Sequence, residues 1–172
     1  MVKLLEWPDL LYSVFLIIFF YFLAKSKSSK EIADKPYYKY YHIALIYRMI
    51  FAAIFCILYW EYYRGGDTIS YFLGAKAMHI VMLNDFLDYI FLLFNDPNGW
   101  SWAKFEKVGV FPEVYMFRDT RTYLVIKLTS FIGVFGFGGF MATTLFVSKF
   151  TFRWIWMIFE VLANRYPYLV KE

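Results

Sequence analysis

The hydrophobic residues of this chain lie in long runs that polar clusters separate. The first run covers 10–24, directly after Trp7 and Pro8, and a second covers 42–62. A helix needs about 20 apolar residues to cross the hydrocarbon core of a bilayer, and about 17 is a practical minimum. Proline suits a first helical turn, and tryptophan rings favour the membrane–water interface. The pattern predicts spanning helices over about 8–24 and 42–62.

Two arrangements are open for the last apolar stretch. In the first, one helix spans 128–148 and an amphipathic helix over 150–163 follows it in the cytoplasm. In the second, 123–135 is a half-helix and the span is about 138–162, since glycines at 133, 136, 138 and 139 invite a break. The second arrangement places Lys149 and Arg153 at membrane depth, which is costly unless they face a bundle or a cavity. Each arrangement gives three spans.

The charged residues between the runs predict the orientation of the chain. Residues 25–39 contain five lysines and only two acidic residues. Short loops with such a lysine excess stay in the cytoplasm. We therefore expect a cytoplasmic loop over 25–39, an N-terminus outside and, after three spans, a cytoplasmic C-terminus.

The segment from 63 to 121 is mildly acidic and is expected outside the membrane. Its apolar residues between 69 and 94 recur at helical spacing, with charged residues at the other positions. The Asn-Asp-Pro-Asn-Gly sequence at 95–99 is typical of a turn. This segment predicts one or two amphipathic helices on the membrane surface.

The composition is typical of an all-α integral membrane protein, and the charge distribution favours lipid over nucleic acid as its partner. Hydrophobic residues make up 61% of the 172 residues, more than a soluble core of this size needs. Backbone polar groups in lipid leave only helices or closed barrels, and these apolar runs are too long for barrel strands. The net charge of +4 comes from basic clusters beside apolar runs, which favours the lipid bilayer as a partner over nucleic acid. Cys56 is the only cysteine, and the pattern indicates no metal site and specifies no cofactor.

The most informative polar stretch is 62–72, where a spanning helix leaves the membrane through Gly65 and Gly66. Asp67 follows the two glycines, and it is either a capping residue of the next helix or a catalytic carboxylate at the interface. Arg64 and Tyr71 flank it as candidate substrate-binding residues.

A second basic cluster precedes the last apolar stretch on the same predicted side. It contains Arg118 and Arg121, which are candidate ligands of a phosphate group. The alternative role of both arginines is an interfacial anchor.

The order of these motifs resembles the N-terminal part of bacterial multipass polysaccharide polymerases, of the O-antigen or exopolysaccharide type, and of related C-type glycosyltransferases. The similarity covers about 40–165 and rests on Tyr-Tyr-Arg-Gly-Gly-Asp-Thr-x-x-Tyr-Phe after a span, then amphipathic helices, then Arg-Asp-x-Arg. It implies that Asp67 acts on the acceptor or binds a metal, and that Arg118 or Arg121 faces a lipid diphosphate. The implied reaction is displacement of a polyprenyl diphosphate by a sugar hydroxyl in a bacterial inner membrane.

That family usually has eight or more spans, whereas this sequence predicts about three. The resemblance therefore implies a part of such an enzyme, a shortened relative or a small subunit. The alternative function is a non-enzymatic membrane subunit, in which the glycines at 133, 136, 138 and 139 let helices of partner chains approach closely.

Overall fold

The computed structural model describes residues 5–63 and 65–166, and it is all-α. Two short segments of other helix types flank α2: a 3₁₀ helix before it and a π-helix after it. The elements are α1 (Trp7–Glu31), the 3₁₀ helix (Pro36–Tyr40), α2 (Tyr41–Leu58), the π-helix (Tyr59–Tyr63), α3 (Asp67–Asn84), α4 (Phe86–Phe94), α5 (Gly99–Val108), α6 (Val114–Arg118), α7 (Thr120–Phe135) and α8 (Phe140–Arg165).

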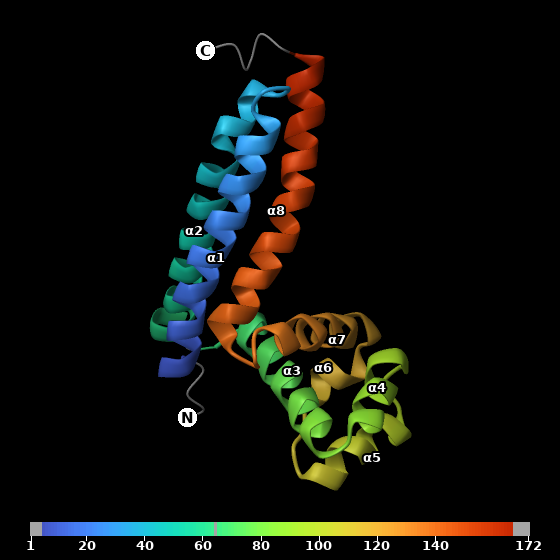
Figure 1. The fold of residues 1–172 in the computed structure, drawn as a ribbon. Helices are drawn as coiled ribbons and strands as arrows, with labels where there is room; N and C mark the ends of the chain where they lie inside the picture. The colour runs from blue at the N-terminus through green and yellow to red at the C-terminus, as the bar shows by residue number, and fades with distance from the viewer. Residues whose placement is uncertain (1–4, 64, 167–172) are drawn as a thin grey trace.

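The helices α1, α2 and α8 run side by side as a three-helix bundle, and α3 to α7 form a separate module at one end of it (Figure 1). We call the bundle end that carries Trp7 and Phe140 the module end, and the end that carries Glu31 and Arg165 the lysine end. Leu45, Met49 and Leu145 are fully buried between the bundle helices, whereas the module has a core of its own. The chain therefore folds around two hydrophobic cores.

The outer surface of the bundle is apolar, and two of its helices are long and hydrophobic enough to cross a membrane. These are α1 and the continuous helical segment Pro36–Tyr63, and among the described residues the bent pair α7 and α8 raises the number of candidate spans to three. Phe15, Phe22 and Phe51 are each more than half exposed. Exposed side chains of this kind along whole helices are typical of contact with lipid.

The helix α1 is longer than the predicted span of 8–24, and it reaches Glu31. Only 32–35 lies outside the helices between α1 and the 3₁₀ helix, so most of the expected loop over 25–39 is helical. Serines and lysines in this stretch do not stop a helix, because lysine is a good helix former and a positive charge in the last turn interacts favourably with the helix dipole. At 25 residues, α1 is about 37 Å long, which exceeds the hydrocarbon core of about 30 Å.

The chain bends sharply between α7 and α8, so the helix proposed over 128–148 does not exist. The two helices meet at 102°. Phe137 and Gly138 have positive φ angles of 49° and 70°, which end α7 and redirect the chain. The glycine-rich break and the long helix after it correspond to the second of the two arrangements, although α8 extends as one helix to Arg165.

Several polar groups of α8 contact the other helices of the bundle. The guanidinium of Arg48 donates to the carbonyl oxygen of Ser148 at 3.2 Å and to the hydroxyl of Thr151 at 2.7 Å, joining α2 to α8. At the lysine end, Glu160 accepts hydrogen bonds from the Tyr38 hydroxyl and from the Trp156 indole. A helix with several charged residues can therefore run beside α1 and α2.

Residues 67–135 fold as a compact module, in which the one or two helices predicted between 69 and 94 are two, α3 and α4. Met78, Phe105 and Tyr123 are fully buried in its core. The turn at 95–99 is present between α4 and α5, where Asn98 caps α5 by accepting from the Ser101 amide. Of the apolar residues that suggested a membrane-surface helix, Met78 and Val81 pack inside the module, whereas Leu83, Leu87 and Phe94 remain exposed.

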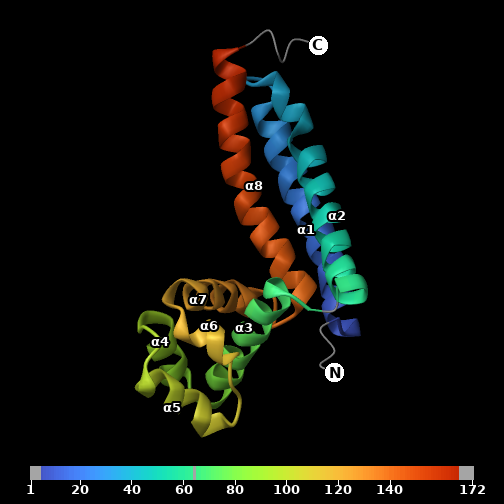
Figure 2. The same ribbon diagram turned by 180° about the vertical axis from the view of Figure 1, so that it is seen from behind.

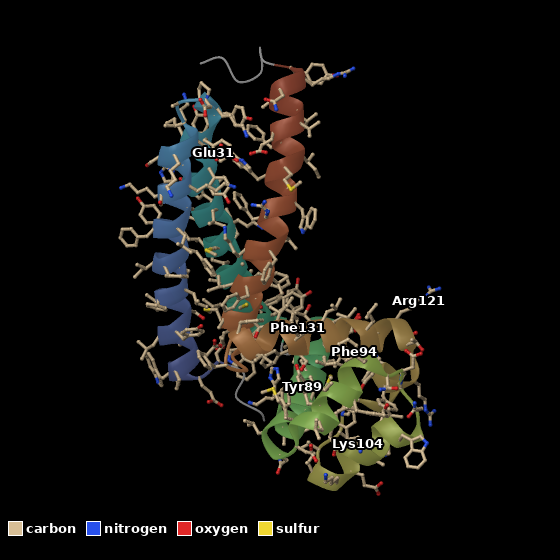
Figure 3. All side chains as sticks on the ribbon, turned by 45° about the vertical axis from the view of Figure 1, so that its right-hand side comes forward. Glu31, Tyr89, Phe94, Lys104, Arg121 and Phe131 are labelled. Atoms are coloured by element: carbon tan, nitrogen blue, oxygen red, sulfur yellow. The ribbon has the colours of Figure 1, made fainter. Side chains whose placement is uncertain are left out.

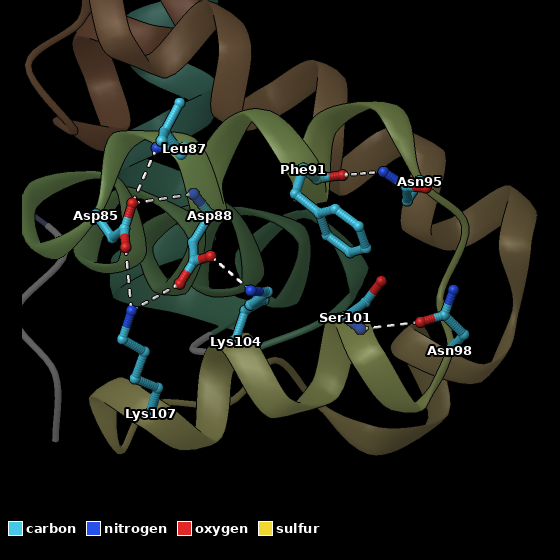
Figure 4. A network of polar contacts seen from close by, with 9 residues as sticks. All are labelled: Asp85, Leu87, Asp88, Phe91, Asn95, Asn98, Ser101, Lys104 and Lys107. Carbon is cyan, nitrogen blue, oxygen red and sulfur yellow. Dashed lines mark hydrogen bonds and ion pairs between the residues drawn. The ribbon is translucent and has the colours of Figure 1, made fainter.

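Two lysines and two carboxylates tie α4 to α5 (Figure 4). The ammonium of Lys104 lies 2.6 Å from Asp88, and that of Lys107 lies 3.0 Å from both Asp85 and Asp88. These contacts hold the pKa values of both aspartates below their ordinary range, chiefly through hydrogen bonds from Lys107 to Asp85 and from Lys104 to Asp88. Asp85 also caps α4. The cluster therefore has a structural role.

The helix α7 forms the layer of the module nearest to the bundle in both views (Figure 2). One face packs on α3, where Gly74 allows the close approach of Ile126. The other face exposes about half of each of Leu124, Leu128 and Phe131. Because α7 is almost perpendicular to α8, this apolar face lies along the membrane plane when α8 runs along the membrane normal.

Candidate functional site

A cavity of about 530 Å³ lies where the module meets the bundle. Its walls come from the start of α1, from the second half of α3 and from the glycine-rich turn between α7 and α8. We call it the junction cavity, and its polar side chains are Glu6, Asp9, Lys76 and His79. This volume is within the range of small-molecule sites.

Asp9 is a buried carboxylate on α1 that caps the N-terminus of α8. Its two oxygens accept from the backbone N–H groups of Met141 at 2.9 Å and Ala142 at 3.0 Å, in the first turn of α8. Those N–H groups have no partner within the helix, and the positive end of the helix dipole favours the negative charge. A Cβ at Gly139 would lie 2.2 Å from an Asp9 oxygen, so the glycine permits this contact. Asp9 therefore holds α1 against the turn that forms the cavity wall.

His79 presents one ring nitrogen to the cavity and uses the other in a buried hydrogen bond. Its Nε2 lies 2.7 Å from the carbonyl oxygen of Ser130, so Nε2 carries the hydrogen of the neutral ring. The nitrogen nearest to Gly138, a residue of the cavity wall, is Nδ1. Burial lowers the pKa of His79, which keeps the ring neutral near pH 7. His79 Nδ1 is therefore a hydrogen-bond acceptor and a potential base.

Lys76 and Glu6 supply the remaining charges of the junction cavity. Lys76 lies three residues before His79 on α3, on the same helix face, and its side chain is half-buried. Glu6 is exposed at the start of α1. Neither residue takes part in an ion pair among the described residues. The cavity thus offers a cation, a carboxylate and a neutral imidazole to a ligand.

The structure places Asp67 at the first position of α3, with an exposed side chain. The capping position is Gly66, whose φ angle of 99° favours glycine, and Asp67 makes no capping hydrogen bond. One turn later, the Ser70 hydroxyl donates to Glu113 at 3.1 Å. Among the described residues Asp67 forms no ion pair, and it lies outside the junction cavity.

The two arginines of the predicted phosphate site lie elsewhere. Arg118 ends α6, and Arg121 lies at the end of α7 farthest from the bundle, where it points outwards (Figure 3). Between them, Asp119 caps α7 by accepting from the amides of Arg121 and Thr122. Among the described residues, neither arginine forms an ion pair with Asp67. The structure thus does not gather these three residues into one site.

Tyr71 and Arg64 complete the set of predicted site residues. Tyr71 lines a second, smaller cavity of about 240 Å³ between α2, α3, α7 and α8, whose polar groups are threonine hydroxyls such as Thr68 and Thr129. Arg64 lies outside the described residues. The proposed pairing of Arg64 and Tyr71 with a substrate stays a prediction.

The glycines expected to face partner helices are used within this chain. A Cβ at Gly133 would lie 2.7 Å from the His79 ring, and one at Gly136 would lie 2.9 Å from the Thr143 amide nitrogen. Gly138 has a positive φ angle, and Gly139 faces Asp9. Contacts within this chain, with His79, Thr143 and Asp9, therefore require small residues at 133, 136 and 139.

Sequence reasoning did not single out Glu6, Asp9 or Lys76 as members of a site. One signal was present, because an acidic residue within the first turn of a spanning helix is costly unless it has a partner. In the described part of the chain, no three side chains of His, Cys, Asp or Glu come together as a metal site requires. Comparison with protein-family models, with curated proteins and with solved structures gave no match.

Proposed function

We propose that this chain is a membrane protein of cell-envelope polysaccharide synthesis that transfers a glycosyl group from or to a lipid-linked sugar. The observation that supports the proposal is the junction cavity, which combines titratable side chains with a position beside the lipid-exposed bundle. A lipid-linked sugar requires polar side chains and contact with lipid at one site, because its polyprenyl chain remains in the bilayer while its diphosphate and sugar reach the interface. The resemblance of residues 40–165 to polysaccharide polymerases supports the same class of substrate.

The side chains of the cavity suit displacement of a polyprenyl diphosphate by a sugar hydroxyl. The hydroxyl oxygen forms a bond to the anomeric carbon, and the bond from that carbon to the diphosphate oxygen breaks. The diphosphate leaves with the bonding electron pair, and the Lys76 ammonium stabilises its charge. The proton of the attacking hydroxyl passes to His79 Nδ1, which is neutral and accepting.

Asp67 is the alternative base, as the family resemblance implies. Its position at the start of α3 is compatible with a base at the interface, whereas Arg118 and Arg121 need a substrate that reaches the far end of α7. The two versions of the site differ in which side chains carry the activity. In both versions of the site, we propose that the chain lies in a bacterial inner membrane with the module outside and the lysine end in the cytoplasm.

The test uses the purified chain in lipid nanodiscs with a polyprenyl diphosphate-linked sugar as the probe. We expect Lys76→Gln to weaken binding about tenfold, and His79→Gln to retain binding and abolish transfer to an added acceptor sugar. Lys25→Gln is the matched control, because Lys25 is an exposed lysine close to the other end of α1.

Loss of transfer in Asp67→Asn with full activity in His79→Gln would assign the base to Asp67. Absence of probe binding to the wild-type chain, with partner chains copurified in fixed ratio, would contradict the enzyme proposal and favour a membrane subunit.

A further inference from the structure

A second cavity with charged walls lies in the bundle, towards the lysine end. It has a volume of about 370 Å³ and lies between α1 and α8, and Tyr41 of α2 also lines it. Three of its side chains are cationic, namely Lys27, Lys149 and Arg153, and none of its lining residues is acidic. We call it the basic cavity. It is separate from the junction cavity, which lies at the module end.

The three cations are close together, and no carboxylate of the described residues pairs with them. The ammonium groups of Lys27 and Lys149 lie 4.9 Å and 5.7 Å from the centre of the same ring, that of Tyr41. Arg153 follows Lys149 by four residues on α8, so both side chains leave the same face of that helix. Among the described residues, none of the three cations forms an ion pair.

The carboxylate available on α8 serves other residues. Glu160 accepts from Tyr38 and Trp156, and it lies seven residues after Arg153, which is about 10 Å along the helix. Aromatic rings surround Lys149, because its ammonium lies 5.9 Å from the Phe20 ring centre and 6.0 Å from that of Phe152. The faces of aromatic rings attract cations but do not neutralise them. A cluster of three positive charges in a membrane bundle therefore calls for an anion.

The position of the cavity matches the phosphate level of a bilayer. Lys27 lies 20 residues after Trp7, which places it about 30 Å along α1 from that residue. This distance equals the thickness of a hydrocarbon core, so with Trp7 at one interface Lys27 lies at the other. The part of the cavity nearer the module end is apolar, since Phe20 and Leu23 precede Lys27 on α1 and Phe146 precedes Lys149 on α8. Lys149 and Arg153 begin deeper, about 14 and 20 Å along α8 from Phe140, but the Lys149 ammonium reaches the same Tyr41 ring as Lys27. The cations thus gather on the side of the lysine-end headgroups, and the apolar residues lie at acyl-chain depth.

We propose that the basic cavity binds the phosphate group of an anionic phospholipid from the leaflet at the lysine end. Lys27, Lys149 and Arg153 contact the phosphate, and an acyl chain lies along Phe20, Leu23 and Phe146. Basic pockets between spanning helices bind anionic headgroups in this way. The bound phosphate offsets the repulsion among the three cations and holds α1 against α8.

The experiment measures lipid binding to the full chain, purified in mild detergent, by native mass spectrometry and by thermal unfolding. The probes are phosphatidylglycerol as the anionic lipid, phosphatidylcholine as the zwitterionic one, and inorganic phosphate. We expect phosphatidylglycerol to remain bound and to raise the unfolding temperature, while phosphatidylcholine does neither. Lys27→Gln and Arg153→Gln should each weaken phosphatidylglycerol binding about fivefold, the contribution of one basic residue at an anionic surface.

Two variants separate the site from general charge effects. Lys25→Gln is the matched control, because its ammonium lies over the ring of Tyr21 and it is not part of the cavity. Lys149→Arg keeps the charge and should retain binding, whereas Lys149→Gln should not. Equal weakening by Lys25→Gln, or equal retention of both lipids, would overturn the proposal. Full competition by millimolar inorganic phosphate would identify a site for free phosphate and would also overturn the assignment to a lipid.

Discussion

Removal of the Asp9 carboxylate tests how the module is attached to the bundle. Asp9 accepts from two backbone N–H groups at the start of α8, and these groups have no other partner in the helix. Loss of a capping side chain costs about 0.5 to 2 kcal/mol, and a hydrogen bond to a charged group contributes about 1.5 to 3 kcal/mol. Because Asp9 lines the junction cavity, water can replace part of what is lost. We therefore expect Asp9→Ala to lower the free energy of unfolding by about 2 kcal/mol.

Asn at the same position separates hydrogen bonding from charge. Asp9→Asn keeps one oxygen acceptor and loses the negative charge beside the helix dipole, so its cost should be about half that of Asp9→Ala. For a chain of this size, a change of about 1 kcal/mol corresponds to roughly 2 to 4 °C in the unfolding temperature. We expect Asp9→Ala to unfold about 4 to 8 °C below the wild type in detergent, with Asp9→Asn between them.

The matched control for Asp9 is Asp34→Ala, which removes an exposed carboxylate between α1 and the 3₁₀ helix. Hydrogen exchange gives a second measurement, because the amides of Met141 and Ala142 should lose protection in Asp9→Ala while those of the bundle core keep it. An unfolding temperature equal to that of Asp34→Ala, with unchanged exchange at 141 and 142, would refute this account of the junction.

Three further perturbations probe the two cores. Asp88→Asn should destabilise the module by about 1 kcal/mol, because Lys104 loses its ion-pair partner. In the wild type, calorimetry should show that the Asp88 carboxylate contributes its full stabilisation above the unfolded pKa of about 3.9, and that this stabilisation is lost as the pH falls through the lower pKa of the folded state. Arg48→Ala should cost about 2 kcal/mol in thermal unfolding through the lost contacts to α8, and an unchanged unfolding temperature would contradict that role. Tyr123→Phe should leave stability equal or higher, since the buried Tyr123 hydroxyl has no hydrogen-bond partner among the described residues; a loss above about 1 kcal/mol would show a contact that this account lacks.

The spans were largely predictable from the sequence because they depend on local composition. The length of an apolar run and the lysines after it are enough to place α1 and α2 approximately. The end of α1 was misplaced, because polar residues beyond the hydrocarbon core still form helix. The break near 136–139 was one of two open arrangements, and it depends on contacts such as that of Gly139 with Asp9, 130 residues earlier.

The module and the junction cavity were beyond prediction from sequence patterns. Amphipathic spacing between 69 and 94 shows that one helix face is apolar, but it does not say whether that face meets lipid or a second helix layer. Buried residues such as Phe105 and Tyr123 come from separate helices that the pattern could not pair. His79 and Lys76 gain their place in the cavity only because α3 packs against the turn before α8.

The arrangement of the chain in the membrane is tested most directly by chemical labelling at two positions. In a Cys56→Ala background, Lys107→Cys places a thiol on α5 of the module, and Lys30→Cys places one at the lysine end of α1. A maleimide that cannot cross membranes is added to intact cells and, separately, to lysed cells. If the bundle spans the membrane with the module outside, the thiol at 107 reacts in intact cells and the thiol at 30 reacts only after lysis. Reaction of both thiols from the same side would contradict a bundle that spans the membrane, and the reverse pattern would contradict the proposed orientation.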